Sequence, residues 1–324
     1  MIRPAVRLIA TLFLLILCGP TAWAESYPTK QISIVVPYAP GGALDTLARV
    51  VGKGLEKELG RPVIIENKAG GANIIGNAYV AHASHDGYTL LFAGAPLALN
   101  QALGMKQPYD ALKDFAPISL VATTPMLLAV NLSSPYHTLA DVLRAAGDSG
   151  KGLDYATAGV GSMPNLLGEA LRLQTRTTLT HIGYKGSAPA LTAVLGGSVP
   201  VIIDAFTPTG TAVKQGQLRG IVVASKHRVA ALPGIPTTAE AGFPSIVGEG
   251  FYGILAPAGT SSEIVKRLHD AIVKVTSDES LRRSLVNLGF DVVAGSPDEY
   301  TVYLRNEIER WAPVVKEAGI QVDQ

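Results

Sequence analysis

The sequence has little cysteine and little charge of either sign. Cys18 is the only cysteine among 324 residues, so neither an intrachain disulfide nor a cluster of thiolates for a metal can form. Charged residues make up 16% of the chain, and the formal net charge is +1. Such a chain has no basic field with which to hold a nucleic acid or an anionic membrane. The composition therefore excludes disulfide-stapled domains and charge-driven binders of nucleic acids.

The common catalytic and phosphate-binding motifs are also missing. The sequence contains no G-x-x-x-x-G-K-[ST] phosphate loop and no G-x-S-x-G nucleophile elbow. A dinucleotide pattern starts at Gly159 and Gly161 but fails, because Pro164 stands in the place of the third glycine. His82 and His85 lie near the expected end of a helix, and we interpret them as surface residues rather than metal ligands. We therefore expect no catalytic residue, no metal and no cofactor.

Only the amino terminus carries a long apolar run. Two arginines precede residues 8–17, which are apolar apart from one threonine, and residues 22–24 form an Ala-Trp-Ala cleavage pattern. Because this run is too short to span a membrane, it predicts a signal peptide over residues 1–24 that is cleaved after Ala24. A lipoprotein interpretation is weak, since bulky Leu17 precedes Cys18 where a small residue is expected.

Cleavage after Ala24 changes the totals. It removes two arginines, no acid and the only cysteine, so the mature chain has 25 basic and 26 acidic side chains and a net charge of −1. A chain without cysteine suits an oxidising periplasm, and one of this length can be stable by burial alone. We therefore expect an exported periplasmic protein.

Strand-like and helix-like patterns alternate along the mature chain. Short β-branched runs predict strands, and apolar residues at helical spacing predict helices. The alternation favours an α/β fold of mostly parallel sheets flanked by helices. The expected strands are residues 32–36, 63–65, 89–92, 153–156, 180–182, 201–203 and 221–224. The expected helices are residues 45–59, 73–82, 164–175, 187–195, 261–275 and 297–310.

Capping residues and a proline predict where the last helices begin and end. Thr260 with Glu263, and Ser296 with Glu299, have the spacing of capping boxes. Pro313 is expected to break or kink the final helix.

Two apolar segments are typical of crossovers between two domains. One is the strand-like stretch 117–130, interrupted at residues 123–125, and the other is 248–256. Two strands that cross between α/β lobes would form a hinge beside a cleft. The expected domains are lobe 1, residues 25–124 and 248–324, and lobe 2, residues 125–247.

Two glycine-rich loops each link an expected strand to an expected helix. In open α/β sheets ligands bind beyond the carboxyl ends of the strands, where helix N-termini offer free N–H groups. Because neither loop contains Lys or Arg, an anion held there would depend on backbone N–H groups and hydroxyls such as that of Ser162. Ordinary βα turns remain the alternative. The candidate ligand-binding residues are Tyr38, Ala39, Pro40, Gly41 and Gly42 in the first loop, and Ala158, Gly161, Ser162, Met163 and Asn165 in the second.

Two acids stand beside these loops. Asp45 is most simply a structural helix N-cap, with Arg49 as its partner one turn later. Asp204 ends an apolar run and would lie at the same strand edge, where it could accept a ligand N–H or a bridging water. A cap for the following turn is the alternative role of Asp204.

Motifs along the whole mature chain resemble one known family. They are similar in content and order to the Bug family, the periplasmic receptors of tripartite tricarboxylate transporters. The resemblance implies a type II periplasmic-binding-protein (flytrap) fold, in which two lobes close on a small carboxylate without catalysis or cofactor. The motifs are IVVPYAPGGALDTLAR (residues 34–49), GRPV (60–63), ENKAGG (66–71), DGYTLL (86–91), YKGSAPAL (184–191), PTTAEAG (236–242) and GILAPAGT (253–260).

The resemblance also implies which residues meet the ligand. In the family both glycine-rich loops grip the ligand carboxylate, and an acid matching Asp204 contacts the ligand in some amino-acid-binding members. Where many members carry histidine or hydroxyl residues, this chain has Asn165, Ala158 and Ala95, and Met163 is apolar. We therefore expect a mono- or dicarboxylate with an apolar or aromatic body, amino acids included, rather than a citrate-like tricarboxylate.

The function expected from the sequence is capture of this carboxylate by a monomer and its delivery to the membrane subunits of a tripartite tricarboxylate-type transporter. A sensory receptor that presents the ligand to a membrane sensor kinase would share the same pocket. An exported hydrolase is the enzyme alternative, but Ser162 has no convincing histidine partner in the sequence.

Overall fold

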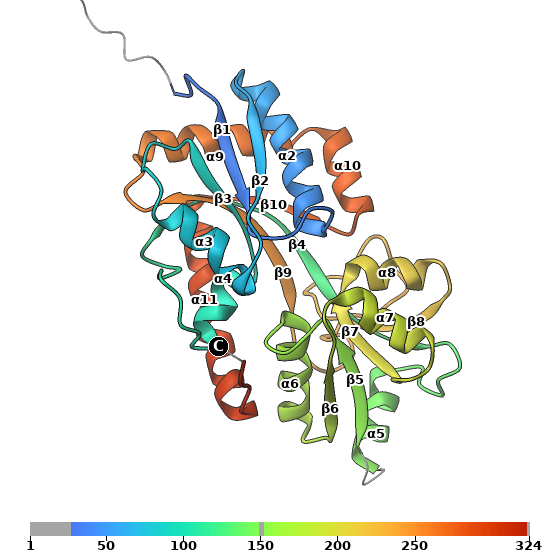
Figure 1. The fold of residues 1–324 in the computed structure, drawn as a ribbon. Helices are drawn as coiled ribbons and strands as arrows, with labels where there is room; N and C mark the ends of the chain where they lie inside the picture. Colours follow the sequence, from blue (N-terminus) through green and yellow to red (C-terminus); the bar gives the residue numbers. More distant parts are fainter. Residues whose placement is uncertain (1–26, 149–151, 323–324) are drawn as a thin grey trace, which may run out of the picture.

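One long strand organises the fold. In the computed structural model, which describes residues 27–148 and 152–322, β4 (Phe115–Asn131) runs through the middle of a mixed sheet (Figure 1). Its beginning pairs with β9 (Glu249–Pro257) and β10 (Asp291–Gly295), and its end pairs with β7 (Val201–Ala205) and β8 (Leu218–Val223). We call the strands on these two sides the first and second halves of the sheet. The expected signal peptide lies outside the described residues.

Each half of the sheet contains one set of three parallel strands. In the first half, β1 (Ile32–Val36) lies between β2 (Val63–Asn67) and β3 (Thr89–Gly94). In the second half, β5 (Leu153–Thr157) lies between β6 (Leu179–Gly183) and β7. The expectation of mostly parallel sheets is wrong, because β4 leaves the first half and β9 returns to it, so that these neighbours pair antiparallel.

Alternating side chains of the strands bury both faces of the sheet. Ile34 and Phe92 pack with the helices α2 and α9 on one face, whereas Val35 and Leu91 point to the opposite core. Because successive side chains of a strand point to opposite faces, each face needs its own cover, and helices lie on both faces, as Figure 1 shows. The helices are α2 (Ala43–Leu59), α3 (Ile74–Ala81), α4 (Pro96–Ala102), α5 (Leu139–Asp148), α6 (Met163–Thr175), α7 (Ser187–Leu195), α8 (Phe206–Lys214), α9 (Ser262–Thr276), α10 (Glu279–Asn287) and α11 (Pro297–Ala318), with a 3-10 turn η1 (Gly71–Asn73).

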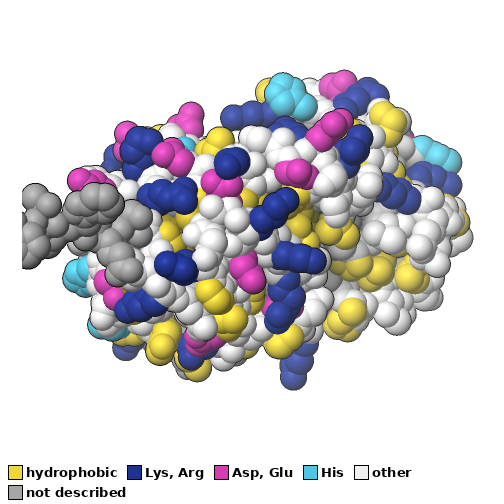
Figure 2. All heavy atoms as spheres, turned by 90° about the horizontal axis from the view of Figure 1, so that it is seen from above, with side chains coloured by type: hydrophobic (Ala, Val, Ile, Leu, Met, Phe, Trp, Pro, Cys, Tyr) yellow, Lys and Arg dark blue, Asp and Glu magenta, His cyan; other side chains and the backbone are white. Residues whose placement is uncertain are grey.

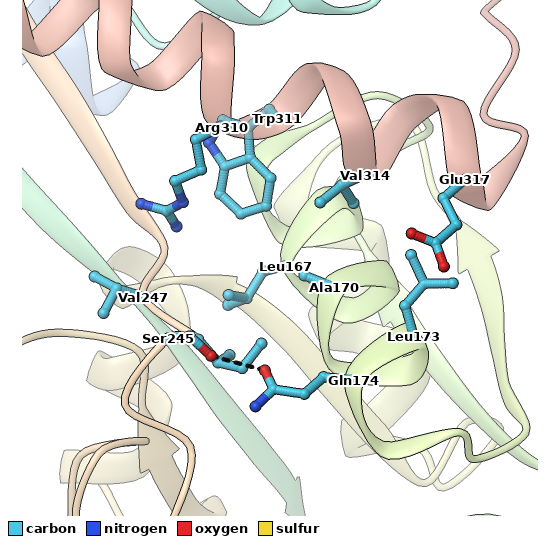
Figure 3. Close-up of a pocket in the computed structure, with 11 residues that line it drawn as sticks. Leu167, Ala170, Leu173, Gln174, Ser245, Val247, Arg310, Trp311, Val314 and Glu317 are labelled. Atoms are coloured by element: carbon cyan, nitrogen blue, oxygen red, sulfur yellow. Dashed lines mark hydrogen bonds between the residues drawn. The ribbon is translucent and has the colours of Figure 1, made fainter.

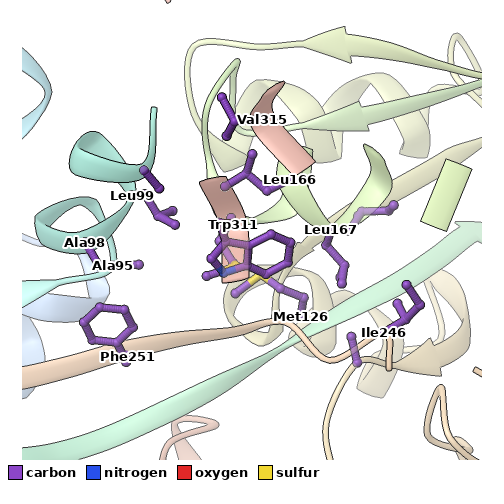
Figure 4. Close-up of a cluster of buried hydrophobic side chains, with 14 of the residues drawn as sticks. Ala95, Ala98, Leu99, Met126, Leu166, Leu167, Ile246, Phe251, Trp311 and Val315 are labelled. Atoms are coloured by element: carbon purple, nitrogen blue, oxygen red, sulfur yellow. The ribbon is translucent and has the colours of Figure 1, made fainter. Parts of the chain in front are cut away.

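The largest buried cluster crosses from one half of the sheet to the other. Trp311 of α11 is 1% exposed and lies among Met126, Leu166 and Leu167 (Figure 4). Its indole Nε1 donates to Glu307 Oε2 at 2.9 Å, so its one polar atom is satisfied inside the core. The end of α11 is therefore held against α6 by apolar burial.

The structure corrects several expectations about element ends. α11 continues through Pro313 to Ala318; Pro313 lies on the exposed side of the helix, where water can satisfy a carbonyl that loses its helical partner. Ser261 rather than Thr260 caps α9, while the capping box of Ser296 and Glu299 is confirmed. The pattern did not predict α4, α5, α8, α10 or β10.

The face seen from above in Figure 1 carries charges of both signs. Lys and Arg side chains are spread among Asp and Glu side chains over this face (Figure 2). Ion pairs include Lys274 Nζ with Glu58 Oε2 at 2.7 Å and Lys266 Nζ with Asp270 Oδ2 at 2.6 Å. Among the described helices, none has the length and apolar character needed to cross a membrane.

Close packing of α6 on β5 yields a first prediction. A methyl group on Gly168 would lie 2.3 Å from the Tyr155 ring, which cannot move freely because its hydroxyl donates to Glu169 Oε1 at 2.8 Å. Gly168→Ala should therefore lower the free energy of unfolding by about 1–3 kcal/mol, measured by urea denaturation. Gly147→Ala is the control, since open space surrounds that exposed helical glycine, and it should raise stability by up to ~1 kcal/mol. Equal effects of the two substitutions would contradict this packing argument.

Candidate functional site

The carboxyl ends of the two parallel strand sets face each other across the middle of the molecule (Figure 1). The loops after β1 and β3 approach from the first half, and those after β5 and β7 approach from the second. The candidate ligand residues predicted from the sequence lie on or beside these four loops. Open α/β sheets bind their ligands at such edges, so we take this region as the candidate site.

The first glycine-rich loop is braced by Asp45. Gly41 has a φ of +88°, and its N–H donates to Asp45 Oδ2 at 2.9 Å. The helix begins at Ala43 with Gly42 as N-cap, so Asp45 is the third helical residue and the expectation that it is the N-cap is wrong. It reaches back to the loop instead.

The carboxylate of Asp45 is held ionised by its partners. Burial alone would raise its pKa, but hydrogen bonds from Arg49, Gly41 and Asn67 outweigh this effect and lower the pKa to about 2. Arg49 Nε lies 2.9 Å from Asp45 Oδ2, which confirms the predicted pairing one turn later. Asn67 Nδ2 also donates to the carbonyl of Tyr38 at 3.0 Å.

The second glycine-rich loop repeats this geometry with an amide. Gly161 has a φ of +74°, and its N–H donates to Asn165 Oδ1 at 3.0 Å. α6 begins at Met163, so Asn165 occupies the same third helical position as Asp45 does in α2. Asn165 is 2% exposed and its Nδ2 donates to the Tyr155 hydroxyl at 3.4 Å, so it braces the loop from inside.

Ser162 caps α6 rather than projecting a free hydroxyl. Its Oγ donates to the carbonyl of Gly159 at 2.6 Å and accepts from the N–H of Asn165 at 3.5 Å. The nearby His181 shares a hydrogen bond with Thr157 Oγ1 instead, at 2.6 Å. Ser162 therefore has no base partner among the described residues, which leaves the hydrolase alternative without its nucleophile.

Several helix N-termini around the site have no side-chain cap. The N-caps of α2 and α7 are Gly42 and Gly186, and neither helix receives a capping hydrogen bond from a side chain. By contrast, α9, α10 and α11 are capped by Ser261, Asp278 and Ser296. Uncapped N–H groups carry the positive end of the helix dipole and suit an anion. The N–H of Gly186 also donates to the carbonyl of Ala158 at 3.0 Å, which places the start of α7 beside the second loop.

Asp204 lies at the carboxyl end of β7, where the two halves of the sheet meet. It is 1% exposed; Oδ1 accepts the N–H of Ala205 at 2.8 Å, while Oδ2 is buried without a hydrogen bond. Burial raises its pKa to about 6, although the nearby Ser187 hydroxyl and the Ala205 N–H favour the ionised form. Burial also raises the pKa of Tyr252 to about 12, with a smaller contribution from Asp204. Burial, with a smaller contribution from Tyr252, raises the pKa of the half-buried Tyr38 as well.

A cavity of about 390 Å³ lies between the second loop and the first half of the molecule. Of the predicted residues it includes Ala158, Gly161 and Ser162, and Pro96 in its wall follows predicted Ala95 directly. Met163 lies in the large core cluster. The lining consists of Ala72, Asn73, Pro96, Asn100, Leu103, Met105, Ala158, Gly159, Val160, Gly161, Ser162, Gln321 and Val322.

The rest of the predicted residues are not in this wall. Residues 38–42 of the first loop are not part of the lining. Asn73, which is, connects the cavity to this loop, because its Nδ2 donates to the carbonyl of Pro37 at 2.5 Å. The sequence pattern missed Asn73, Leu103 and Val322. Only Asn73 had a local signal, because it follows the turn-forming pair at residues 70–71.

Another cavity, of about 350 Å³, opens between α6 and α11 away from both loops (Figure 3). Its walls are mainly apolar, with Leu167 and Val314 facing each other, and Ser245 Oγ donates to Gln174 Oε1 at 2.9 Å on one side. None of the ligand residues predicted from the sequence lines it. We therefore place the candidate site at the loops.

Metal ligation has no support in the part of the chain that the structure describes. His82 and His85 are both exposed, and His82 Nδ1 lies 2.7 Å from the carbonyl of Ala78. No group of three or more His, Cys, Asp or Glu side chains within residues 27–148 and 152–322 is placed to hold a metal ion.

Comparison with known proteins identifies the family. The model of the tripartite tricarboxylate transporter family receptor, TctC, matches residues 47–320. The chain is 34% identical to the protein BugT of Bordetella pertussis over 302 residues, which covers 92% of each chain.

Solved structures show the same fold. The Rpa4515 protein of R. palustris, solved with adipate, is 32% identical with a TM-score of 0.79, covering 91% of this chain and 99% of that one. MatC from Rhodopseudomonas palustris, solved with malate, is 31% identical with a TM-score of 0.77, covering 89% and 100%. The α/β fold is thus that of periplasmic binding proteins, which bind their solutes without catalysis. This chain belongs to the TctC or Bug family, the receptors of tripartite tricarboxylate transporters.

Proposed function

We propose that this protein is a periplasmic receptor that holds a small mono- or dicarboxylate between the two halves of its sheet. It delivers this solute to the membrane subunits of a tripartite tricarboxylate-type transporter. The observation that carries the proposal is that two glycine-rich loops and the uncapped N-termini of α2 and α7 lie at the facing carboxyl ends of the two strand sets, with a cavity beside the second loop whose described lining residues are uncharged. The adipate and malate bound by two relatives support a carboxylate as the ligand.

Backbone donors are sufficient to hold such an anion. Each helix N-terminus contributes about 0.3–1 kcal/mol, or up to ~2 kcal/mol when it is partly buried. Each hydrogen bond to a charged group adds about 1.5–3 kcal/mol. A few of these contributions together reach the binding free energy of ~8 kcal/mol that a micromolar complex needs, after the cost of association is subtracted. The absence of an arginine grip also favours release, which a carrier requires.

The two halves of the sheet act as lobes in this proposal. Residues 25–124 and 248–324 form lobe 1, and residues 125–247 form lobe 2. β4 and β9 cross between them side by side, and Pro125 pairs with Glu249 at the crossing point. Bending at this pair of strands would close the loops on the ligand.

Asp204 contributes a hydrogen-bond acceptor at the carboxyl end of β7. Its unbonded Oδ2 could accept a hydroxyl, an N–H or a bridging water of the ligand. Binding of such a donor would offset the cost of burying this oxygen without a partner.

A panel of acids tests the proposed ligand class. Isothermal titration calorimetry near neutral pH should find an apolar or aromatic mono- or dicarboxylate that binds at about micromolar Kd. Citrate should bind at least about tenfold more weakly, because the described residues that line the cavity include no cation for a third carboxylate. Citrate binding clearly tighter than every mono- and diacid tested would refute the expected ligand class.

Closure of the lobes predicts a change in shape. Small-angle X-ray scattering should give a smaller radius of gyration with the best ligand of the panel than without it. An acid of the panel that shows no binding by calorimetry serves as the control and should leave the radius unchanged. An unchanged radius with a saturating, proven ligand would show that the pocket is closed in advance.

Asp204 makes the stability of the free protein depend on pH. Because its pKa of about 6 in the folded state lies above the ordinary 3.8, the unfolded chain loses this proton first as the pH rises. The folded state therefore loses stability between about pH 4 and pH 6 and does not regain it above. Relative to wild type, Asp204→Asn should gain of order 2–3 kcal/mol in unfolding free energy between about pH 4 and pH 7.5.

The control for this measurement is Asp154→Asn, on the exposed side of β5. Its difference from wild type should be the same at both pH values in urea denaturation. A pH-independent difference for Asp204→Asn as well would mean that folding does not raise the pKa of this carboxylate, contrary to the argument.

A further inference from the structure

The helix α11 joins the two halves of the sheet. It packs on β9 in the first half, where the ring centroids of Tyr303 and Phe251 lie 5.1 Å apart in an edge-to-face contact. Further along the helix, Trp311 is 1% exposed and lies against Leu166 and Leu167 of α6 in the second half (Figure 4). One helix therefore contacts both halves through buried side chains.

The Trp311 side chain is fixed from two sides. Its indole Nε1 donates to Glu307 Oε2 at 2.9 Å, and the Arg310 guanidinium carbon lies 4.3 Å from the centre of the indole ring (Figure 3). Arg310 Nη1 also lies 3.3 Å from Glu307 Oε1, so the three side chains hold one another. A tryptophan with a hydrogen bond and a cation–π contact has little freedom to change its orientation when its neighbours move.

The second glycine-rich loop begins one helical turn from this contact. The N–H of Leu166 donates to the carbonyl of Ser162, the N-cap of α6, at 3.0 Å. Leu166 also directly follows Asn165, whose Oδ1 accepts the N–H of Gly161 at 3.0 Å. The backbone of α6 thus connects the packing of Trp311 to the position of the loop.

The same contact lies beside the point where the chain crosses between the halves. Leu167 packs on Gly248, since a methyl group on that glycine would come within 2.9 Å of Leu167 Cδ1. Gly248 directly precedes β9, and its carbonyl accepts the N–H of Met126 of β4 at 2.9 Å. Rotation of the halves about this point would keep Trp311 buried, whereas separation of α6 from α11 would expose a large apolar area.

We propose that Trp311 is a positioning residue of the ligand site, which holds the second loop in place against the first half of the sheet. The inference rests on the proposed carboxylate function and adds the contact about which the two halves turn. Trp311 acts through α6, because it is not among the residues that line the cavity at the loop. A loop that is held in place before binding loses less freedom when the ligand arrives, so the affinity depends on this distant side chain.

Substitutions test the effect on affinity. Calorimetry with adipate, hexanoate and benzoate measures the Kd of each variant at a temperature where circular dichroism shows it folded. Trp311→Ala should raise the Kd of the acids that wild type binds by about tenfold or more, because α6 loses its support. Trp311→Phe keeps an aromatic ring at this place and should bring the Kd back to within about threefold of wild type.

Phe115→Ala is the matched control for these substitutions. Phe115 is 4% exposed in the same core cluster, but it lies at the beginning of β4, in the first half. Its loss should lower the melting temperature and leave the Kd within about twofold of wild type.

Fluorescence tests the contact itself. Trp23 belongs to the expected signal peptide, so Trp311 is the only tryptophan of the mature chain. Its emission should be that of a buried indole, and acrylamide should quench it equally weakly with and without a saturating acid. Ready quenching in the ligand-free protein would show that the halves separate at this contact, which overturns the proposal.

The outcomes distinguish this inference from the proposed function. The positioning role is overturned if the Kd of Trp311→Ala stays within about twofold of wild type, or if Phe115→Ala raises the Kd as much. If Trp311→Ala does not fold, Trp311→Leu takes its place and should raise the Kd by a smaller factor; an unchanged Kd again overturns the role. If wild type binds none of the three acids, the proposed function fails for these acids, while quenching of the ligand-free protein still decides whether the contact holds the halves together.

Discussion

The fold depends on a single strand that both halves of the sheet share. β4 is buried over nearly its whole length, and it carries hydrogen bonds to β9 and β10 at one end and to β7 and β8 at the other. Because each parallel set attaches to this strand or to its neighbour β9, the carboxyl ends of both sets face the same middle region. The position of the site is therefore a consequence of topology. The side chains at the loops then decide only what binds there.

The two glycine-rich loops share one backbone hydrogen-bond geometry but use side chains of different charge to form it. In each, a glycine with positive φ donates its N–H to the side chain four residues later, which is Asp45 in the first loop and Asn165 in the second. The carboxylate of Asp45 is ionised and offset by Arg49, whereas the amide of Asn165 carries no charge. A ligand carboxylate meets less repulsion at the second loop. The cavity also lies at that loop, which agrees with this electrostatic asymmetry.

Local pattern predicted the parallel strands well, because a short β-branched run with glycine or proline after it has few alternatives. It failed at β4, where residues 123–125 looked like an interruption. Thr124 is buried there because its hydroxyl donates to the carbonyl of Gly289 at 3.0 Å, a partner 165 residues away. It failed likewise at α10, a short helix with only three apolar residues, of which Leu285 alone is buried. The loops of the site were predictable from glycine and from the family resemblance, but Leu103 and Val322 enter it only through packing of distant segments.

The missing charges of the cavity are as informative as its donors. An arginine would strengthen binding of every acid, whereas a wall whose described residues include no cation penalises each additional carboxylate of a ligand. Specificity then arises from the cost of desolvating the wrong ligand as well as from contacts with the right one. Among the described residues, Asp204 is the buried acid that lies at a strand end, and its unbonded oxygen can pair with a hydrogen-bond donor but not with another anion. The proposed site thus combines loops that offer backbone N–H groups to a carboxylate with an acid whose unbonded oxygen favours a hydrogen-bond donor on the ligand.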